Sequence, residues 1–257
     1  MKVKRFISEF LICSCWVLFC SITFGLSSTT IEMDEENRVG YVHSETDDMY
    51  FVDLTKNSIQ SFLKTSQNEF YTTFANCETE LASTGKKMVF ATNGGMFHAN
   101  QMPVGLYIEN GIQIQAIDTL KKSGNFYLMP NGIFSIEDGK AQIRTTTQFI
   151  KAKPNPTLAT QSGPILVTNG KIHPAFNRDS PNRYIRSGVG IIDETHLVFV
   201  ISNKAVNFHS FAILFRDKLN CQNALYLDGA ISKMFVNDGA DVRLEDGAFG
   251  VILGVVE

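Results

Sequence analysis

The chain has little cysteine and little net charge. Three of its five cysteines, Cys13, Cys15 and Cys20, lie near the N-terminus, which leaves Cys77 and Cys221. There is no C-x-x-C pair, so a cysteine-based zinc site is not expected. The net charge is −3, and Lys and Arg are scattered without a long block of one sign. The broad basic field that attracts nucleic acid is therefore missing, and a nucleic-acid partner is disfavoured.

The N-terminus has the composition of an export signal. A basic start, MKVKR, precedes an apolar run over 6–26 and then the polar stretch SSTT. We expect residues 1–27 to be a cleaved signal peptide or, because the run is nearly long enough to span a bilayer, an anchor. Residues 28–40 are expected to be a linker and residues 41–257 the folded domain. That domain would be periplasmic or secreted, in contact with a membrane only through this N-terminus, and export would allow a Cys77–Cys221 disulfide.

Turn-forming pairs interrupt the middle of the chain. β-branched or aromatic runs flank Asn110-Gly111, Asn131-Gly132, Asp138-Gly139 and Asn169-Gly170. Both central residues of a type I′ turn need positive φ, and such pairs adopt it at low cost. The pattern predicts antiparallel hairpins, and its irregular spacing argues against a solenoid.

A few helices are expected between these strands. Apolar periodicity predicts a helix or two over 58–81, a brief helix or a loop over 145–156, and an amphipathic helix over 207–219. Another hairpin is predicted over 187–202, with its tip at 193–195. Strands outnumber helices and do not alternate with them one by one. We therefore expect an α+β fold, mainly antiparallel sheet with a few packing helices, in a single domain.

Four stretches place polar residues and glycines where apolar runs end. They are ATNGGMFH (91–98), QSGPILV (161–167), RYIRSGVGI (183–191) and YLDGAISKMF (226–235). Binding and catalytic groups are often found where rigid strands pass into loops. These stretches are therefore the candidates for a functional site.

Three side chains in these stretches have the chemistry of a sugar-phosphate site. Asn93 can donate to and accept from a sugar hydroxyl, although Asn before glycine is also typical of a turn. Arg186 ends a basic segment, and its planar guanidinium matches phosphate oxygens; the alternative is a surface ion pair. Asp228 follows an apolar strand, as a candidate acid, base or nucleophile, or as the start of an Asx turn.

The four stretches, in this order, resemble the phosphodiester glycosidase family over residues 40–257. Members of that family have an NGG-aromatic stretch, a TGP-like turn, an R-x-x-VG strand and a late LDGG-x-S turn. This chain departs from the pattern at Met96, where an aromatic is common, and at Ala230 and Ile231, where relatives have glycine. Its RSGVG replaces the usual RTAVG. The variants resemble an exported bacterial branch, and the lost glycines leave the sugar preference open.

The resemblance implies an exported hydrolase that cleaves the glycosidic bond of a sugar-1-phosphodiester or a related envelope glycan. It implies Asp228, Arg186 and Asn93 as catalytic residues. The substrate-binding residues that we expect are Gly94, Gly95, Phe97, His98, Gln161, Ser162, Gly229 and Ser232.

Two other functions stay open at this point. A glycan-binding protein of the cell envelope would use the same pocket without cleavage, and a metal-dependent phosphodiesterase would cut the P–O bond. No cofactor and no metal site is expected, with calcium as an option at the spaced acids of 236–247, which lack the full calcium-loop register. Ser232 has a second interpretation, as the cap of a helix beginning within ISKMF.

Overall fold

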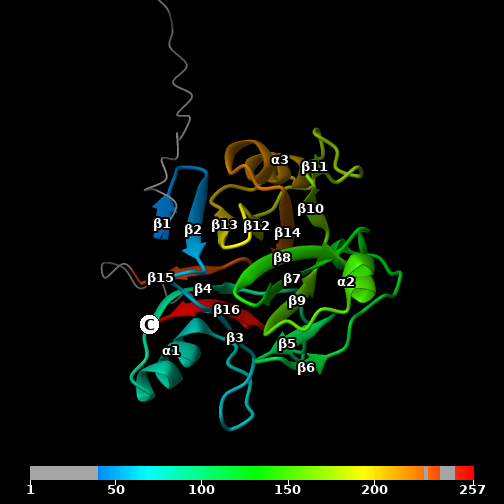
Figure 1. Ribbon diagram of the computed structural model, residues 1–257. Coiled ribbons are helices and arrows are strands. Elements are labelled where there is room, and N and C mark those ends of the chain that lie inside the picture. Colours follow the sequence, from blue (N-terminus) through cyan, green and yellow to red (C-terminus); the bar gives the residue numbers. More distant parts are fainter. Residues whose placement is uncertain (1–39, 229–230, 238–246) are drawn as a thin grey trace, which may run out of the picture. The chain divides into compact units, whose positions relative to one another are not determined.

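The computed structural model describes residues 40–228, 231–237 and 247–257. The expected signal peptide (1–27), nearly all of the expected linker (28–40), Gly229 and most of the calcium option (236–247) lie outside the described residues. The described residues belong to one compact unit built around three antiparallel sheets (Figure 1). This architecture confirms the expected α+β fold.

The three sheets have seven, four and five strands. The seven-stranded sheet has the order β1 (Gly40–His43), β2 (Asp47–Asp53), β13 (His196–Ser202), β12 (Ser187–Ile191), β14 (Asn223–Asp228), β10 (Ile165–Thr168), β11 (Lys171–Ile172). The four-stranded sheet has the order β15 (Met234–Val236), β4 (Met88–Asn93), β16 (Ile252–Val256), β3 (Ile59–Phe62). The five-stranded sheet has the order β6 (Ile112–Gln115), β5 (Tyr107–Glu109), β9 (Leu158–Ser162), β7 (Gly132–Glu137), β8 (Lys140–Thr145).

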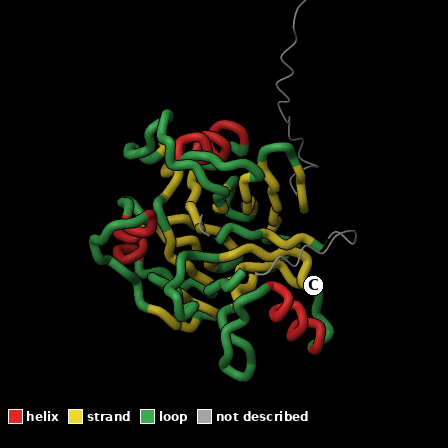
Figure 2. The backbone as a smooth tube through the Cα atoms, turned by 180° about the vertical axis from the view of Figure 1, so that it is seen from behind, coloured by secondary structure: helices red, strands yellow, loops and turns green. Residues whose placement is uncertain are grey.

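Short helices lie at the outside of these sheets, as the view from behind in Figure 2 shows. They are α1 (Phe74–Ser83), α2 (Thr146–Ala152) and α3 (Phe208–Ile213), which continues as the π-helical turn η3 (Leu214–Lys218), and the 3₁₀ turn η2 (Asn125–Tyr127). The helices predicted within 145–156 and 207–219 are confirmed. None of the helices in the described part of the chain is long and apolar enough to cross a membrane.

The helix predicted over 58–81 is wrong over residues 58–73. Residues Ile59–Phe62 form β3, which pairs with β16 through Phe62 opposite Ile252 and Ile59 opposite Val255. Backbone pairing and burial of this strand outweigh its local helical period. The helix begins only at Phe74, where the Thr73 side chain accepts a hydrogen bond from the Asn76 amide at 3.1 Å.

Three of the four predicted turn pairs occupy hairpin turns. Both residues have positive φ in Asn110-Gly111, Asp138-Gly139 and Asn169-Gly170, which join β5 to β6, β7 to β8 and β10 to β11. The prediction for Asn131-Gly132 is wrong, because Gly132 already belongs to β7. The Asn131 amide instead donates to the Phe126 carbonyl at 3.0 Å and accepts from the Thr146 hydroxyl at 2.7 Å.

Aromatic side chains from all three sheets meet in the main core. Phe90 of β4 contacts two rings of the seven-stranded sheet, with centroid distances of 4.2 Å to Tyr50 and 5.1 Å to Phe199. Phe134 of β7 contacts Phe199 edge-on at 6.0 Å. Each large buried side chain contributes about 1.5–3 kcal/mol to folding. This shared core fixes the ends of strands from different sheets relative to one another.

The amphipathic segment 207–219 packs onto the seven-stranded sheet as predicted. Phe211 and Phe215 are buried and contact each other edge-on at 5.2 Å. The close approach depends on Gly190 of β12, where a Cβ would lie 2.6 Å from both Phe215 Cδ1 and Cys221 Sγ. A glycine is therefore needed there to let the helix reach the strand.

The two cysteines of the described residues do not form a disulfide. Cys77 is buried in the cluster around Phe74, and Cys221 is buried in the cluster around Phe215. Burial raises the pKa of both thiols, that of Cys221 to about 12. They fill core space in separate clusters.

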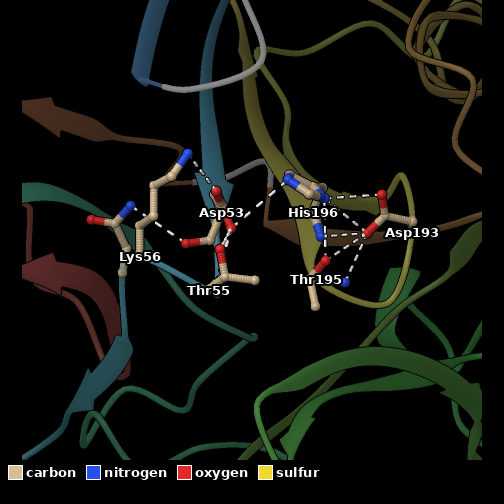
Figure 3. Close-up of polar contacts among 7 residues, drawn as sticks. Asp53, Thr55, Lys56, Asp193, Thr195 and His196 are labelled. Carbon is tan, nitrogen blue, oxygen red and sulfur yellow. Dashed lines mark hydrogen bonds and ion pairs between the residues drawn. The ribbon is translucent and has the colours of Figure 1, made fainter. Parts of the chain in front are cut away.

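Polar contacts hold one end of the seven-stranded sheet (Figure 3), where Asp53 lies opposite His196. The Asp53 carboxylate accepts from the Thr55 hydroxyl at 2.6 Å and from Lys56 Nζ at 3.0 Å. These contacts lower the pKa of Asp53 to about 2. His196 Nε2 lies 3.8 Å from Asp53, and its Nδ1 lies 2.9 Å from Asp193 in the predicted hairpin tip. These contacts connect β2 to the first residue of β13 and to the loop between β12 and β13.

Candidate active site

Asn93, Ser187 and Asp228 meet where strands of two sheets end. Asn93 is the last residue of β4, Ser187 is the first of β12, and Asp228 is the last of β14, directly opposite Ser187. The Asn93 amide donates to the Ser187 hydroxyl at 3.3 Å, and that hydroxyl donates to the Asp228 carbonyl at 3.2 Å. Asn93 and Asp228, far apart in the chain, are thus brought to one place through Ser187.

Ser232 and Lys233 also contact Asp228 and Asn93. The Ser232 hydroxyl donates to the Asp228 carbonyl at 2.6 Å, and the Lys233 amide donates to Asn93 Oδ1 at 3.0 Å. Residues 234–236 then form β15 against β4, so the interpretation of Ser232 as a helix cap is wrong. Ser232 instead holds its loop against the end of β14.

Gly94 and Gly95 let the chain pass between neighbouring strands. Neither has positive φ, and the chain bends at Gly95. A Cβ on Gly94 would lie 2.7 Å from Val251 Cγ1, and one on Gly95 would lie 2.5 Å from the Gln161 carbonyl oxygen. The glycines are needed for close packing, and this packing fixes the backbone that carries Asn93.

Arg186 is fully buried, with 0% of its surface exposed. Its Nε donates to the Val206 carbonyl at 2.8 Å, and its Nη2 donates to the Asn182 carbonyl at 3.1 Å and side-chain oxygen at 2.8 Å. Its Nη1 is buried and has no hydrogen-bond partner among the described residues. The alternative of a surface ion pair is therefore wrong: Arg178 and Arg183 of the same basic segment are exposed, but Arg186 is buried.

Planar side chains stack beside the Arg186 guanidinium. The guanidinium carbon of Arg186 lies 3.7 Å from the centroid of the Phe208 ring. Phe208 stacks on Phe176 at 5.0 Å, and Phe176 stacks on His173 at 4.7 Å. The Tyr226 ring packs edge-on against Phe208, with the two ring centroids 4.9 Å apart. Cation–π contacts of a desolvated guanidinium are worth about 2 kcal/mol, so the stack offsets part of the cost of burying Arg186.

His173 fastens the outer end of this stack. Its Nδ1 accepts from the Ala175 amide at 3.1 Å, so its Nε2 carries the proton and donates to the Met129 carbonyl at 2.9 Å. Burial lowers the pKa of His173. The ring is therefore a neutral, fixed plane on which Phe176 rests.

Tyr226 connects the guanidinium electrostatically with Asp228. Burial raises the pKa of Tyr226; the Arg186 charge opposes that rise and the Asp228 charge adds to it. The centroid of the Tyr226 ring lies 5.4 Å from the guanidinium carbon of Arg186. Burial lowers the pKa of Arg186, yet a guanidinium stays charged in a protein. The site therefore holds a buried cation and, two residues beyond Tyr226, a carboxylate at a strand end.

Other predicted site residues lie further from this group or serve the scaffold. Gln161 uses its whole amide internally: Oε1 accepts from the Leu106 and Asp118 amides, and Nε2 donates to the Asp118 carbonyl and the Thr146 hydroxyl. No hydrogen-bonding position of that side chain is left for a substrate. The Ser162 hydroxyl donates to the Leu227 carbonyl at 2.8 Å and so supports β14 just before Asp228.

Phe97 and His98 lie in the loop after β4. Phe97 is half-buried and forms an isolated bridge with Pro103, and His98 is exposed. The backbone of His98 is bonded to Met102 and Gln101. The binding role of these two side chains stays a prediction, as does that of Gly229.

Sequence reasoning missed Ser187, Tyr226 and Phe208. Ser187 could have been found, because it directly follows Arg186 at the start of a glycine-containing strand, where we expected functional groups. Phe208 had no such signal, since its contact with Arg186 joins a helix to the residue before β12 by tertiary packing alone. Among the described residues, no three His, Cys, Asp or Glu side chains form a group that could hold a metal.

Comparison with known proteins agrees with this geometry. The family model for phosphodiester glycosidases matches residues 86–251. An uncharacterized Escherichia coli protein, YigE, is 35% identical over 191 residues, which is 74% of each chain. The zebrafish N-acetylglucosamine-1-phosphodiester α-N-acetylglucosaminidase catalytic domain, auto-inhibited by its pro-peptide, superposes with a TM-score of 0.54 at 15% identity, over 84% of this chain and 86% of that one.

A second solved structure, a hypothetical protein from Synechocystis, superposes with a TM-score of 0.50 at 13% identity, over 84% of this chain and 61% of that one. At such low sequence identities the two superpositions show only that the fold is shared. The family match covers all three strand ends of the site, Asn93, Ser187 and Asp228. The chain therefore belongs to the phosphodiester glycosidase family and is a glycoside hydrolase.

Proposed function

We propose that this chain hydrolyses the bond between C1 of a sugar and the oxygen of a phosphodiester, outside the cytoplasm. The observation that carries the proposal is the buried guanidinium of Arg186, whose Nη1 lacks a hydrogen-bond partner within the described residues. The next residue, Ser187, contacts both Asn93 and the backbone of Asp228. A buried donor that its own chain does not satisfy is costly unless a ligand uses it.

Arg186 would bind the phosphate. Its Nε and Nη2 are used by the chain, so Nη1 is the nitrogen left to face a phosphate oxygen. As the C1–O bond breaks, its electron pair moves onto that oxygen, and a fixed cation in a dry site stabilises the growing charge. A phosphate is already a good leaving group, so a general acid is less needed.

Asp228 would act at the sugar carbon. As a base it takes one proton from water while the water oxygen bonds to C1; as a nucleophile its own oxygen bonds to C1, and water then cleaves the glycosyl ester. Both routes consume one water and release a free sugar and a phosphate monoester. Ser187 and Ser232 hold the backbone of Asp228 through its carbonyl.

The first substrate to test is N-acetylglucosamine linked through a 1-phosphodiester, because the zebrafish structure carries that activity in its name. The substrate of this chain can differ in the sugar. Ile231 replaces a glycine of the family pattern and packs half-buried beside the cluster of Phe74 and Phe249. A larger side chain next to Ser232 would change the space offered to the sugar.

Export is part of the proposal. The basic, apolar and polar order of residues 1–27 supports a signal peptide. A full-length fusion to a reporter that is active only outside the cytoplasm tests this, with residues 1–27 deleted as the control. Reporter activity that survives the deletion would contradict export by this segment.

The position of bond cleavage tests the chemistry. Hydrolysis in oxygen-18 water should place the label on the C1 hydroxyl of the released sugar and leave the phosphate monoester unlabelled. Label in the phosphate would instead indicate P–O cleavage, as a phosphodiesterase performs it. Saturable binding without any product would indicate a glycan-binding protein.

A further inference from the structure

A cleft lies away from the candidate active site. It has a volume of about 510 Å³ and is formed by β8, α2, the turn between β10 and β11, and the first residue of β14. A second hollow of about 270 Å³ continues it across the β10–β11 turn, because Thr168 and Asn169 line both. Figure 1 shows α2 and β8, two of the elements that carry lining residues.

The lining of the cleft is rich in amides and cations. Two basic side chains, Arg144 and Lys151, lie among the amides of Gln142, Gln148, Asn169 and Asn223. Lys171 adds a third cation in the adjoining hollow. None of the described residues that line either hollow is acidic, and the floor of the main cleft includes Ile143.

Internal hydrogen bonds use the amide oxygens and leave the NH₂ groups. Oε1 of Gln148 accepts from the Thr145 backbone at 2.9 Å, and Oδ1 of Asn223 accepts from the Asn169 backbone at 3.1 Å. The NH₂ groups of both side chains are therefore available to a ligand. Lys151 has no ion pair within the described residues, and Arg144 uses only Nη1 to bind Glu137. The cleft thus presents mainly donors, which suits an oxygen-rich anion.

The cleft and the candidate active site are separate. Asn223 and Asp228 stand at opposite ends of β14, and a strand rises about 3.3 Å per residue. The two places are therefore about 16 Å apart, and a group bound in the cleft would not touch Asp228. None of the described residues that line the cleft carries an aromatic ring, so they offer no stacking surface of the kind that neutral sugars favour.

We propose that this cleft binds the anionic unit of a saccharide, one that carries a phosphate or a carboxylate. Its volume suits one or two sugar units, and its donors come from three separate elements, β8, α2 and β14. Such a site holds a charged glycan at the enzyme without taking part in bond cleavage. The binding does not depend on the proposed reaction.

Side-chain amide signals provide the direct test. Nuclear magnetic resonance titrations of the folded chain, carried out in the Asp228→Asn variant to prevent turnover, use glucose 6-phosphate, trigalacturonate and neutral maltotriose. We expect at least one anionic saccharide to shift the side-chain amides of Gln142, Gln148 and Asn223, and maltotriose to leave them unchanged. The anion that binds identifies phosphate or carboxylate as the recognised group.

Charge reversal supplies the matched control. Lys151→Glu should weaken binding of the anionic saccharide by about fivefold or more. The control is Lys153→Glu, at an exposed position just beyond α2 that does not line the cleft. This control should change the affinity by less than about twofold. The backbone amide spectrum of each variant reports its fold. The proposal is overturned if neither anion shifts these amides, if maltotriose shifts them equally, or if both variants weaken binding alike.

Discussion

The guanidinium carbon of Arg186 lies 3.7 Å from the centroid of the Phe208 ring, and this stack orients the buried cation of the site. The Phe208→Leu variant keeps an apolar group but removes the flat surface. We expect turnover to fall by about tenfold because the plane of Arg186 is no longer fixed, with a loss of about 1 kcal/mol in the free energy of unfolding. The measurement is kcat beside urea denaturation.

Phe215→Leu is the control for that variant. Phe215 packs on Phe211 in the same helical segment, and the rings that lie over the guanidinium among the described residues are those of Tyr184, Phe208 and Tyr226. Because Phe215 is fully buried and Phe208 only half-buried, Phe215→Leu should lower the free energy of unfolding at least as much and yet leave kcat unchanged. Equal losses of kcat in the two variants would show that Phe208 acts only through stability.

Ser187 links Asn93 to the end of β14 through one hydroxyl. Ser187→Ala should lower kcat by about tenfold or more, because Asn93 and Asp228 lose their common contact. Ser162→Ala removes an equally buried hydroxyl that donates to the Leu227 carbonyl. Each change should lower the free energy of unfolding by about 1 kcal/mol. A larger kcat loss in Ser162→Ala than in Ser187→Ala would contradict the assignment.

Asp53 gives the fold a defined acid sensitivity. Its folded-state pKa is about 2, below the ordinary value of 3.8, so its contribution is present above pH 3.8 and is lost as the pH falls toward 2. Asp53→Asn should therefore lower the free energy of unfolding by about 2 kcal/mol at pH 7. Urea denaturation between pH 2 and 7 measures this. The difference from wild type should shrink below pH 3.8, and Glu45→Gln, at an exposed turn position, should show none.

The thiols of Cys77 and Cys221 should be unreactive in the folded chain, because burial raises the pKa of both. Peptide-level mass spectrometry after alkylation should find both unmodified in the native protein and modified in urea. Because Cys77 and Cys221 form no disulfide with each other, a reducing agent should leave the melting temperature of the folded domain unchanged. A peptide that joins Cys77 to Cys221 would contradict the structure.

Local signals in the sequence were sufficient for much of the fold. Asn110-Gly111 and Asp138-Gly139 predicted their hairpins because positive φ is a property of the residues themselves. The spacing of Phe211 and Phe215 predicted the helical face that packs on the sheet. Residues 59–62 were assigned wrongly, since only pairing with a strand near the C-terminus makes them extended.

The candidate site was predictable in part. Asn93 and Asp228 were found because each ends an apolar strand beside glycine, and the structure brings them together through Ser187. The burial of Arg186 could not be predicted, because its aromatic surroundings come from Phe208 on α3 and Tyr226 on β14. Gln161 resembled a pocket residue because sequence does not reveal where a side chain finds its hydrogen bonds.

The cleavage rate of the Asp228→Asn variant tests the central claim most directly. Single-turnover hydrolysis of an N-acetylglucosamine 1-phosphodiester would be compared with wild type at equal concentrations of folded protein. Because Asn has nearly the shape of Asp but no charge, the fold and substrate binding should persist while the rate falls by about a thousandfold or more. A rate within about threefold of wild type would contradict the assignment of Asp228 as the group that acts at the sugar carbon.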